Sequence, residues 1–139
     1  MDSQSLPVPS ATVLNINDDG TIRYILSRML KSAGYGVIEA ANGQDGLSLA
    51  AVNKPNLILL DVQLPDIHGY RVCEILKANV GTAAIPVLMI SANFVQDADK
   101  AAGLLSGANA YLTHPVSRED LTAAVDELLH PAGGGDIVV

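Results

Sequence analysis

The sequence predicts an α/β domain in which helices cover both faces of a five-stranded parallel sheet. Three observations lead to this prediction. Short apolar segments recur along the chain, two of them are apolar at every position, and a helical pattern separates each segment from the next. Strands that alternate with helices pair in parallel through right-handed crossovers, which place helices on both faces of the sheet.

The expected strands are short, and the third and fourth are apolar throughout. This is typical of strands that are buried on both faces. In chain order the strands are expected at Val13–Ile16, Gly36–Ala40, Leu57–Leu60, Val87–Ile90 and Ala110–Leu112. With strand order 2-1-3-4-5, such a doubly wound sheet with five helices is a flavodoxin-like fold.

Each gap between two strands, and the segment after the last strand, contains a helical pattern. The first helix is expected to end at Gly34, which occupies the place of a C-terminal cap. The third is expected over Tyr70–Leu76, and the fourth over Asp97–Ser106, where Ala and Gly make the signal weakest. Two N-terminal capping pairs are expected, Asn42 with Asp45 and Ser117 with Asp120.

The composition fits one domain of ordinary size. The chain has 139 residues, of which 49% are hydrophobic and 17% are charged, so a sizeable core can be buried. We expect a folded domain over residues 11–130, between an N-terminal tail at 1–10 and a flexible C-terminal tail or linker at 131–139.

Charge and cysteine content argue against several classes of function. Eight Lys+Arg against fifteen Asp+Glu give a formal net charge of −7, which disfavours nucleic-acid binding. The single cysteine, Cys73, cannot form an internal disulfide, and neither a signal peptide nor a membrane span is visible. The sequence therefore predicts a cytoplasmic protein that binds neither nucleic acid nor membrane.

Polar residues follow the apolar strands at the edge where ligands bind in such sheets. Asp18 and Asp19 come after the first expected strand, and Asp61 comes directly after the third. The first and third strands are neighbours in the expected order, so Asp18 and Asp61 should face one another. Two close carboxylates either raise a pKa or hold a hard cation, and Mg²⁺ fits such a pair. Asp19 is equally suited to cap the following helix.

The segment 60–69 resembles the phosphoacceptor loop of response-regulator receiver domains. In that family, as here, an aspartate (Asp61) is followed four residues on by proline and eight on by glycine. The resemblance extends from about Val13 to Leu129, and several separate motifs agree in order. The ending Ala110–Val116 is similar to receivers that are fused to or work with hybrid sensor histidine kinases.

The resemblance implies a role for each matching residue. Asp61 would accept a phosphoryl group from a histidine kinase or a histidine phosphotransfer domain. Asp18 would hold Mg²⁺ together with Asp61 and the backbone carbonyl of Gln63. Ser91 would donate a hydrogen bond to a phosphoryl oxygen, and Tyr111 would be the aromatic residue that switches between buried and exposed positions. Signalling would then pass through the surface around the fourth helix, fifth strand and fifth helix.

Two residues depart from the family pattern. Asn17 stands where the first of two acids is usual, so we expect weak Mg²⁺ binding, on the order of millimolar, with its amide oxygen facing a bound water. His114 replaces the phosphate-binding lysine. The resemblance implies a cis bond between His114 and Pro115, which would aim the imidazole at Asp61, and nearby carboxylates and phosphate would raise its pKa.

The two departures from the family pattern leave a second hypothesis open, in which the chain is a pseudo-receiver that binds partners without being phosphorylated. Asn17 and His114 favour it, whereas Asp61, Ser91 and Tyr111 oppose it. His114 would then be an inert replacement.

Two further readings are less well supported. A phosphatase of the haloacid-dehalogenase class needs an acid two residues after the nucleophile, where this chain has Gln63. A flavin-binding flavodoxin is disfavoured because the acidic loop 17–19 would repel the cofactor phosphate. The sequence names neither the cognate kinase nor the effector, and it leaves homodimerisation open.

Overall fold

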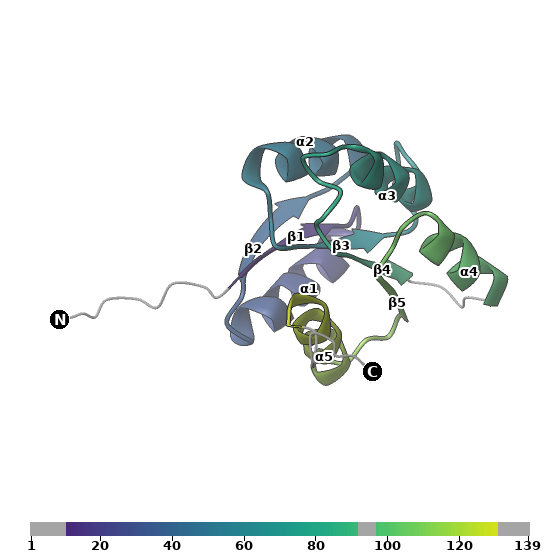
Figure 1. Ribbon diagram of the computed structural model, residues 1–139. Coiled ribbons are helices and arrows are strands. Elements are labelled where there is room, and N and C mark those ends of the chain that lie inside the picture. Colours follow the sequence, from purple (N-terminus) through teal and green to yellow (C-terminus); the bar gives the residue numbers. More distant parts are fainter. Residues whose placement is uncertain (1–10, 92–96, 131–139) are drawn as a thin grey trace, which may run out of the picture.

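The computed structural model describes residues 11–91 and 97–130, which form one five-stranded parallel sheet wrapped by helices (Figure 1). The sheet has the order β2-β1-β3-β4-β5, with all neighbours parallel, as the sequence predicts. The expected tails at 1–10 and 131–139 lie outside the described residues.

The strands agree with the predicted segments to within one residue at either end. They are β1 (Thr12–Ile16), β2 (Gly36–Ala40), β3 (Leu57–Asp61), β4 (Val87–Ser91) and β5 (Ala110–Thr113). The last three each extend by one polar residue beyond the apolar run. Asp61 and Ser91 are therefore strand residues, held by the sheet, rather than the first residues of a loop.

The helices alternate with the strands along the chain. They are α1 (Gly20–Ser32), α2 (Gly43–Asn53), α3 (Gly69–Ala78), α4 (Asp97–Leu105) and α5 (Arg118–Leu129). In Figure 1, α2 and α3 cover one face of the sheet, whereas α1 and α5 cover the other. The weakly signalled fourth helix is present over nearly the predicted range.

The predicted helix caps are confirmed. The side chains of Asn42 and Ser117 accept hydrogen bonds from the backbone N–H groups of Asp45 and Asp120, three residues into α2 and α5. Gly34 follows the C-terminus of α1 with φ +98°, a left-handed conformation that glycine adopts without steric cost. These local signals set where the helices begin and end.

The core has two parts, one on each face of the sheet, because side chains alternate along each strand. Leu14 and Ile16 of β1 pack under α2 and α3, whereas Val13 packs under α1 and α5. Asn15, the next residue on the α1 face, is fully buried although it is polar. None of the helices in the described ranges has the length and apolar character that a membrane span requires.

Candidate functional site

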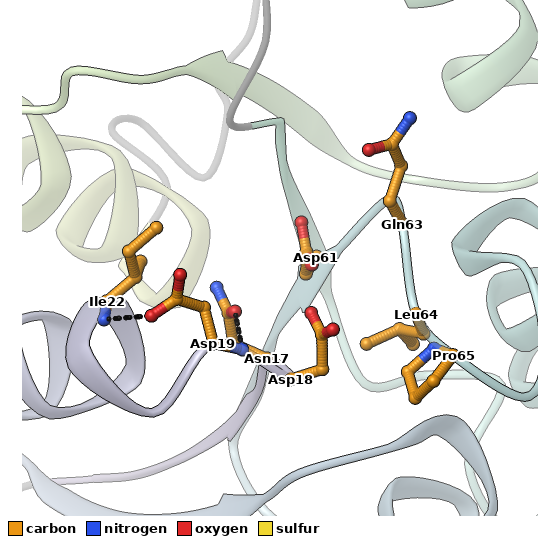
Figure 2. Close-up of a pocket in the computed structure, with 8 residues that line it drawn as sticks. All are labelled: Asn17, Asp18, Asp19, Ile22, Asp61, Gln63, Leu64 and Pro65. Atoms are coloured by element: carbon orange, nitrogen blue, oxygen red, sulfur yellow. Dashed lines mark hydrogen bonds between the residues drawn. The ribbon is translucent and has the colours of Figure 1, made fainter.

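A cavity of about 420 Å³ opens at the carboxyl ends of β1 and β3. Figure 2 shows the carboxylates of Asp18, in the loop after β1, and of Asp61, at the end of the neighbouring strand β3, projecting into the same space. The cavity is lined by Asn17, Asp18, Asp19, Ile22, Asp61, Gln63, Leu64 and Pro65. The juxtaposition of Asp18 and Asp61 is the one expected from the strand order.

Asp61 is the last residue of β3, and only 6% of its surface is exposed. Burial and, next, the nearby charge of Asp18 together raise the pKa of its carboxyl to about 7. Hydrogen bonds from the backbone N–H groups of Gln63 and Val62 oppose the shift by favouring the carboxylate. The carboxylate of Asp61 is therefore a high-energy group that a bound cation would stabilise.

The loop between β1 and α1 orients Asp18. The side-chain oxygen of Asn17, which is 3% exposed, accepts a hydrogen bond of 2.9 Å from the backbone N–H of Asp19. The carboxylate of Asp19 accepts from the N–H groups of Thr21 and Ile22, so it caps α1 (Figure 2). The amide oxygen that we expected to face a bound water is thus already engaged in the turn. Asp18 is left as the acid that faces Asp61.

The loop after β3 closes tightly because residue 69 is glycine. The backbone N–H of Gly69 donates to the Val62 carbonyl at 2.7 Å. A Cβ atom at this position would lie 2.5 Å from the backbone oxygen of Asp61, far inside van der Waals contact. Glycine is therefore needed eight residues after Asp61 to return the chain against the end of β3.

The sequence analysis assigned no role to Asp66, which anchors the same loop. Its carboxylate accepts hydrogen bonds of 2.8 Å from the backbone N–H groups of both Gly43 and Gln44 at the start of α2. These bonds lower the pKa of Asp66. No local signal predicts the contact, because its partners lie more than 20 residues earlier in the chain.

Ser91 and Tyr111 lie on the strands beyond β3. Ser91 ends β4 one residue after the register partner of Asp61, so β4 brings it to the same edge of the sheet. Tyr111 is half-buried in β5, with its ring against α4, where a Cβ added to Gly103 would meet the ring at 2.7 Å. Glycine at 103 therefore makes room for the inward position of the tyrosine ring.

His114 occupies a different pocket from the one expected. Its bond to Pro115 is cis, as predicted. Its side chain, however, lines an apolar pocket of about 190 Å³ together with α1 residues such as Leu26 and Met29, and it does not line the cavity of Asp61. The imidazole Nε2 is buried and has no hydrogen-bond partner among residues 11–91 and 97–130.

The expectation that the pKa of His114 is raised is wrong for this structure. Burial lowers the pKa, because desolvation in an apolar pocket disfavours the charged imidazolium. The reasoning from sequence placed the imidazole among carboxylates, whereas packing against α1 surrounds it with hydrocarbon.

The residues of the acidic cavity fit a magnesium ion. The carboxylates of Asp18 and Asp61 face one another, and Gln63 is among the residues that line the same cavity. Mg²⁺ prefers hard oxygen ligands and is commonly held by one or two carboxylates with several waters. Within the described ranges no cluster of three or more His, Cys, Asp or Glu could hold a metal, so the protein would supply two acids.

The chain is thus a doubly wound α/β domain with a buried aspartate and a second acid at the switch point of its sheet, where such sheets bind their ligands. The chain belongs to the response regulator receiver domain family, whose pattern it matches over residues 13–126. The family resemblance predicted from the sequence is thus confirmed. The chain is a receiver of two-component signalling, of the phosphoacceptor-aspartate type, and a signalling module rather than an enzyme.

Similar proteins agree with this assignment. Protein PilH of Pseudomonas aeruginosa is 36% identical over 119 residues, which cover 86% of this chain and 98% of PilH. The "DNA-binding dual master transcriptional regulator RpaA" of Synechocystis is 44% identical over 84% of this chain. The chain spans 48% of RpaA, and it likewise spans about half the length of several other transcriptional regulators that it matches.

A solved structure adds a bound ion. The receiver domain of the sensor histidine kinase PA1611 from P. aeruginosa has a TM-score of 0.79 and 27% identity, covering 86% of this chain and 97% of that one. Its structure has a magnesium ion coordinated in the active-site cleft. The family thus includes a receiver that binds Mg²⁺ in this cleft.

Proposed function

We propose that Asp61 is the residue that accepts the phosphoryl group, from a histidine kinase or a histidine phosphotransfer partner. The observation that carries the proposal is the buried Asp61 carboxyl facing Asp18 in an open cavity at the switch point of the sheet. In the transfer, an oxygen of Asp61 bonds to phosphorus while the bond from phosphorus to the donor histidine nitrogen breaks, and that nitrogen keeps the electron pair.

The other residues of the cavity prepare this step. We propose that Mg²⁺, when bound by Asp18, Asp61 and the Gln63 carbonyl, neutralises charge on the transferred group. Asn17 supplies no charge, so the affinity for Mg²⁺ is expected to be on the order of millimolar. Ser91 ends β4 at the same edge of the sheet, and we propose that its hydroxyl donates a hydrogen bond to a phosphoryl oxygen.

The output would pass through the surface around α4, β5 and α5. Tyr111 packs against Gly103 of α4, so a movement of Ser91 toward the phosphoryl group would change the position of the tyrosine ring.

We propose that residues 11–130 form the functional domain. We also propose that the protein works in the cytoplasm, where the buried thiol of Cys73 stays reduced. The segment 110–116 supports association with hybrid sensor kinases.

The proposal is tested by mass spectrometry after incubation with a small phosphodonor and Mg²⁺. We expect a gain of one phosphoryl group in the wild type and none in Asp61→Asn. Asp19→Asn is the matched control, because it removes a carboxylate from the same cavity while asparagine still caps α1. A mass gain that survives Asp61→Asn, or is lost in Asp19→Asn alone, would contradict the assignment.

The placement of His114 favours one alternative, a pseudo-receiver that binds partners without phosphorylation. The family's lysine would bring a cation to the acidic cavity, whereas His114 is neutral by burial and lies in an apolar pocket. No mass gain in the wild type with saturating phosphodonor and Mg²⁺ would favour this alternative.

A further inference from the structure

A hydrogen-bonded network on α1 and β2 holds the backbone beside Asp18. Arg23 of α1 donates from Nη1 to the backbone carbonyl of Asn17 at 2.8 Å. Its Nε donates to Oε1 of Glu39, near the end of β2, at 3.1 Å. The guanidinium thus joins the residue before Asp18 to a neighbouring strand, in a planar fork that a shorter or more flexible side chain cannot reproduce.

Two buried polar residues, Asn15 and Ser27, form hydrogen bonds to Arg23 and Glu39. Asn15, fully buried in β1, donates from Nδ2 to the Ser27 hydroxyl at 3.1 Å and to the Arg23 carbonyl at 3.0 Å. The Ser27 hydroxyl donates to Glu39, and this bond is the largest cause of the lowered pKa of that carboxyl, which keeps it ionised. The polar side chain of Asn15 in the middle of β1 therefore links α1, through Ser27, to the ion pair of Arg23 and Glu39.

Hydrogen bonds therefore fix the backbone on both sides of Asp18. Before it, Asn17 receives the Arg23 bond on its carbonyl, and its own N–H donates to the Ala40 carbonyl at 3.0 Å. After it, the N–H of Asp19 is bonded to the Asn17 side chain. Asp18 itself is exposed, and its side chain contacts Asp61, so the position of its carboxylate depends on this backbone rather than on burial in the core.

We propose that Arg23 and Glu39 form a clamp that positions Asp18 for the cation, making both of them positioning residues for the phosphoryl-transfer site. The inference rests on the proposed magnesium site of Asp18 and Asp61. Residues that orient metal ligands without touching the metal commonly change its affinity by about 10- to 100-fold when removed.

Charge alone predicts the opposite effect for Arg23. A guanidinium near the cavity repels Mg²⁺, so its removal should tighten binding if electrostatics dominated. If the clamp dominates, Arg23→Gln weakens binding, because the Asn17 carbonyl loses its donor and Asp18 is free to move. The sign of the change therefore separates the two explanations.

The experiment titrates the full chain with Mg²⁺ alone and follows backbone amide shifts by NMR. We expect Arg23→Gln to weaken Mg²⁺ affinity about tenfold. Arg28→Gln is the matched control, since Arg28 lies on the same helix and bonds the exposed Tyr24 hydroxyl instead, and it should stay within about twofold of the wild type. Unfolding midpoints of both variants verify that the fold is retained.

Glu39→Gln completes a double-mutant cycle. A clamp predicts that the double variant binds Mg²⁺ as weakly as Arg23→Gln alone, because the two residues act as one unit. Independent charges predict that the two opposite effects cancel and restore affinity near the wild type.

The results of these titrations distinguish a failure of the Arg23–Glu39 clamp from a failure of the proposed magnesium site. Equal affinities of Arg23→Gln and Arg28→Gln, tighter binding by Arg23→Gln, or cancellation in the double variant would each overturn the clamp and leave the site standing. A wild type whose amides do not respond to Mg²⁺ would overturn the magnesium site, and the clamp with it.

Discussion

Two neighbouring cavities border α1, and each is lined by a titratable side chain with a shifted pKa, the buried Asp61 in one and the half-buried His114 in the other. In the acidic cavity, burial and the charge of Asp18 raise the pKa of Asp61 to about 7, and in the apolar pocket burial lowers the pKa of His114. The physical cause is the same, because desolvation favours the neutral form of an acid and of a base alike. The neighbours differ: Asp61 has backbone donors and faces Asp18, whereas Nε2 of His114 has no hydrogen-bond partner in the part of the chain that the structure describes.

This difference shows what makes a buried ionisable group suitable for chemistry. Asp61 lies in an open cavity where a cation can stabilise its carboxylate. Binding of the cation therefore offsets the free energy that desolvation of the carboxylate costs. His114 is half-buried and lines an apolar pocket with Leu26, Met29 and other apolar side chains, which offer no stabilisation to its charged form. A histidine in the place of a lysine therefore removes a cation from the site instead of supplying a titratable one.

The largest expected effect concerns stability and Asp61→Asn. The raised pKa means that the stability associated with Asp61 is fully present below its ordinary pKa of 3.8 and is lost as pH rises through about 7. Above pH 7 without Mg²⁺, Asp61→Asn should therefore be more stable than the wild type by roughly 2–4 kcal/mol. Urea unfolding at acidic and alkaline pH measures this, with the exposed Glu127→Gln as control. A difference that does not change with pH would contradict the shift.

The second effect concerns Asp18→Asn, which removes the charge facing Asp61. The pKa of Asp61 should fall toward its ordinary value, because one cause of its rise is gone. Affinity for Mg²⁺ should still fall by about tenfold or more, since the ion loses one of two carboxylates. NMR titration of the Asp61 carboxyl carbon and of backbone amides measures both. Asp19→Asn should change neither by much, and an equal loss in that variant would show that the acids of the loop are interchangeable.

A smaller effect is expected from His114→Leu. Leucine fills the apolar pocket without burying an unpartnered nitrogen, so the variant should gain about 1 kcal/mol near pH 7. The gain should grow as pH falls, because the lowered pKa of His114 means that the unfolded chain binds a proton more readily than the folded one. Thermal unfolding from acidic to neutral pH tests this, with His130→Gln at the exposed end of α5 for comparison. A loss of stability in His114→Leu at every pH would show that the imidazole makes favourable contacts.

The smallest effect is expected on binding of beryllofluoride, a phosphoryl mimic. Because His114 does not line the acidic cavity, wild type and His114→Ala should have parallel affinities between about pH 5.5 and 8.5. His114→Lys, whose longer side chain can leave the pocket, should bind a few-fold more tightly through a charge-assisted hydrogen bond. An affinity that falls with rising pH in the wild type but not in His114→Ala would show that the imidazole reaches the phosphoryl group.

Strands and helix caps could be predicted because their signals are local. The continuous apolar runs at 57–60 and 87–90 became the central strands β3 and β4, and Asn42 and Ser117 cap the helices that they precede. The sequence also predicted that Asp18 and Asp61 face one another. Asp18 follows β1 and Asp61 ends β3, and the strand order makes these two strands neighbours. Local patterns are enough for the strands and the caps, whereas the facing of the two acids also requires the strand order of the fold.

The sequence by itself determined the element order, the sheet and the acidic edge where Asp18 and Asp61 meet. Only the tertiary structure decided where His114 points, what Asp66 holds, and how Arg23 reaches the carbonyl of Asn17. Each of these contacts joins a side chain to an element that packs beside it in space, and its direction depends on competing packing and desolvation energies. Backbone periodicity sets which face of an element a residue lies on, but the partner that a long or titratable side chain reaches is set by the neighbours that folding brings to it.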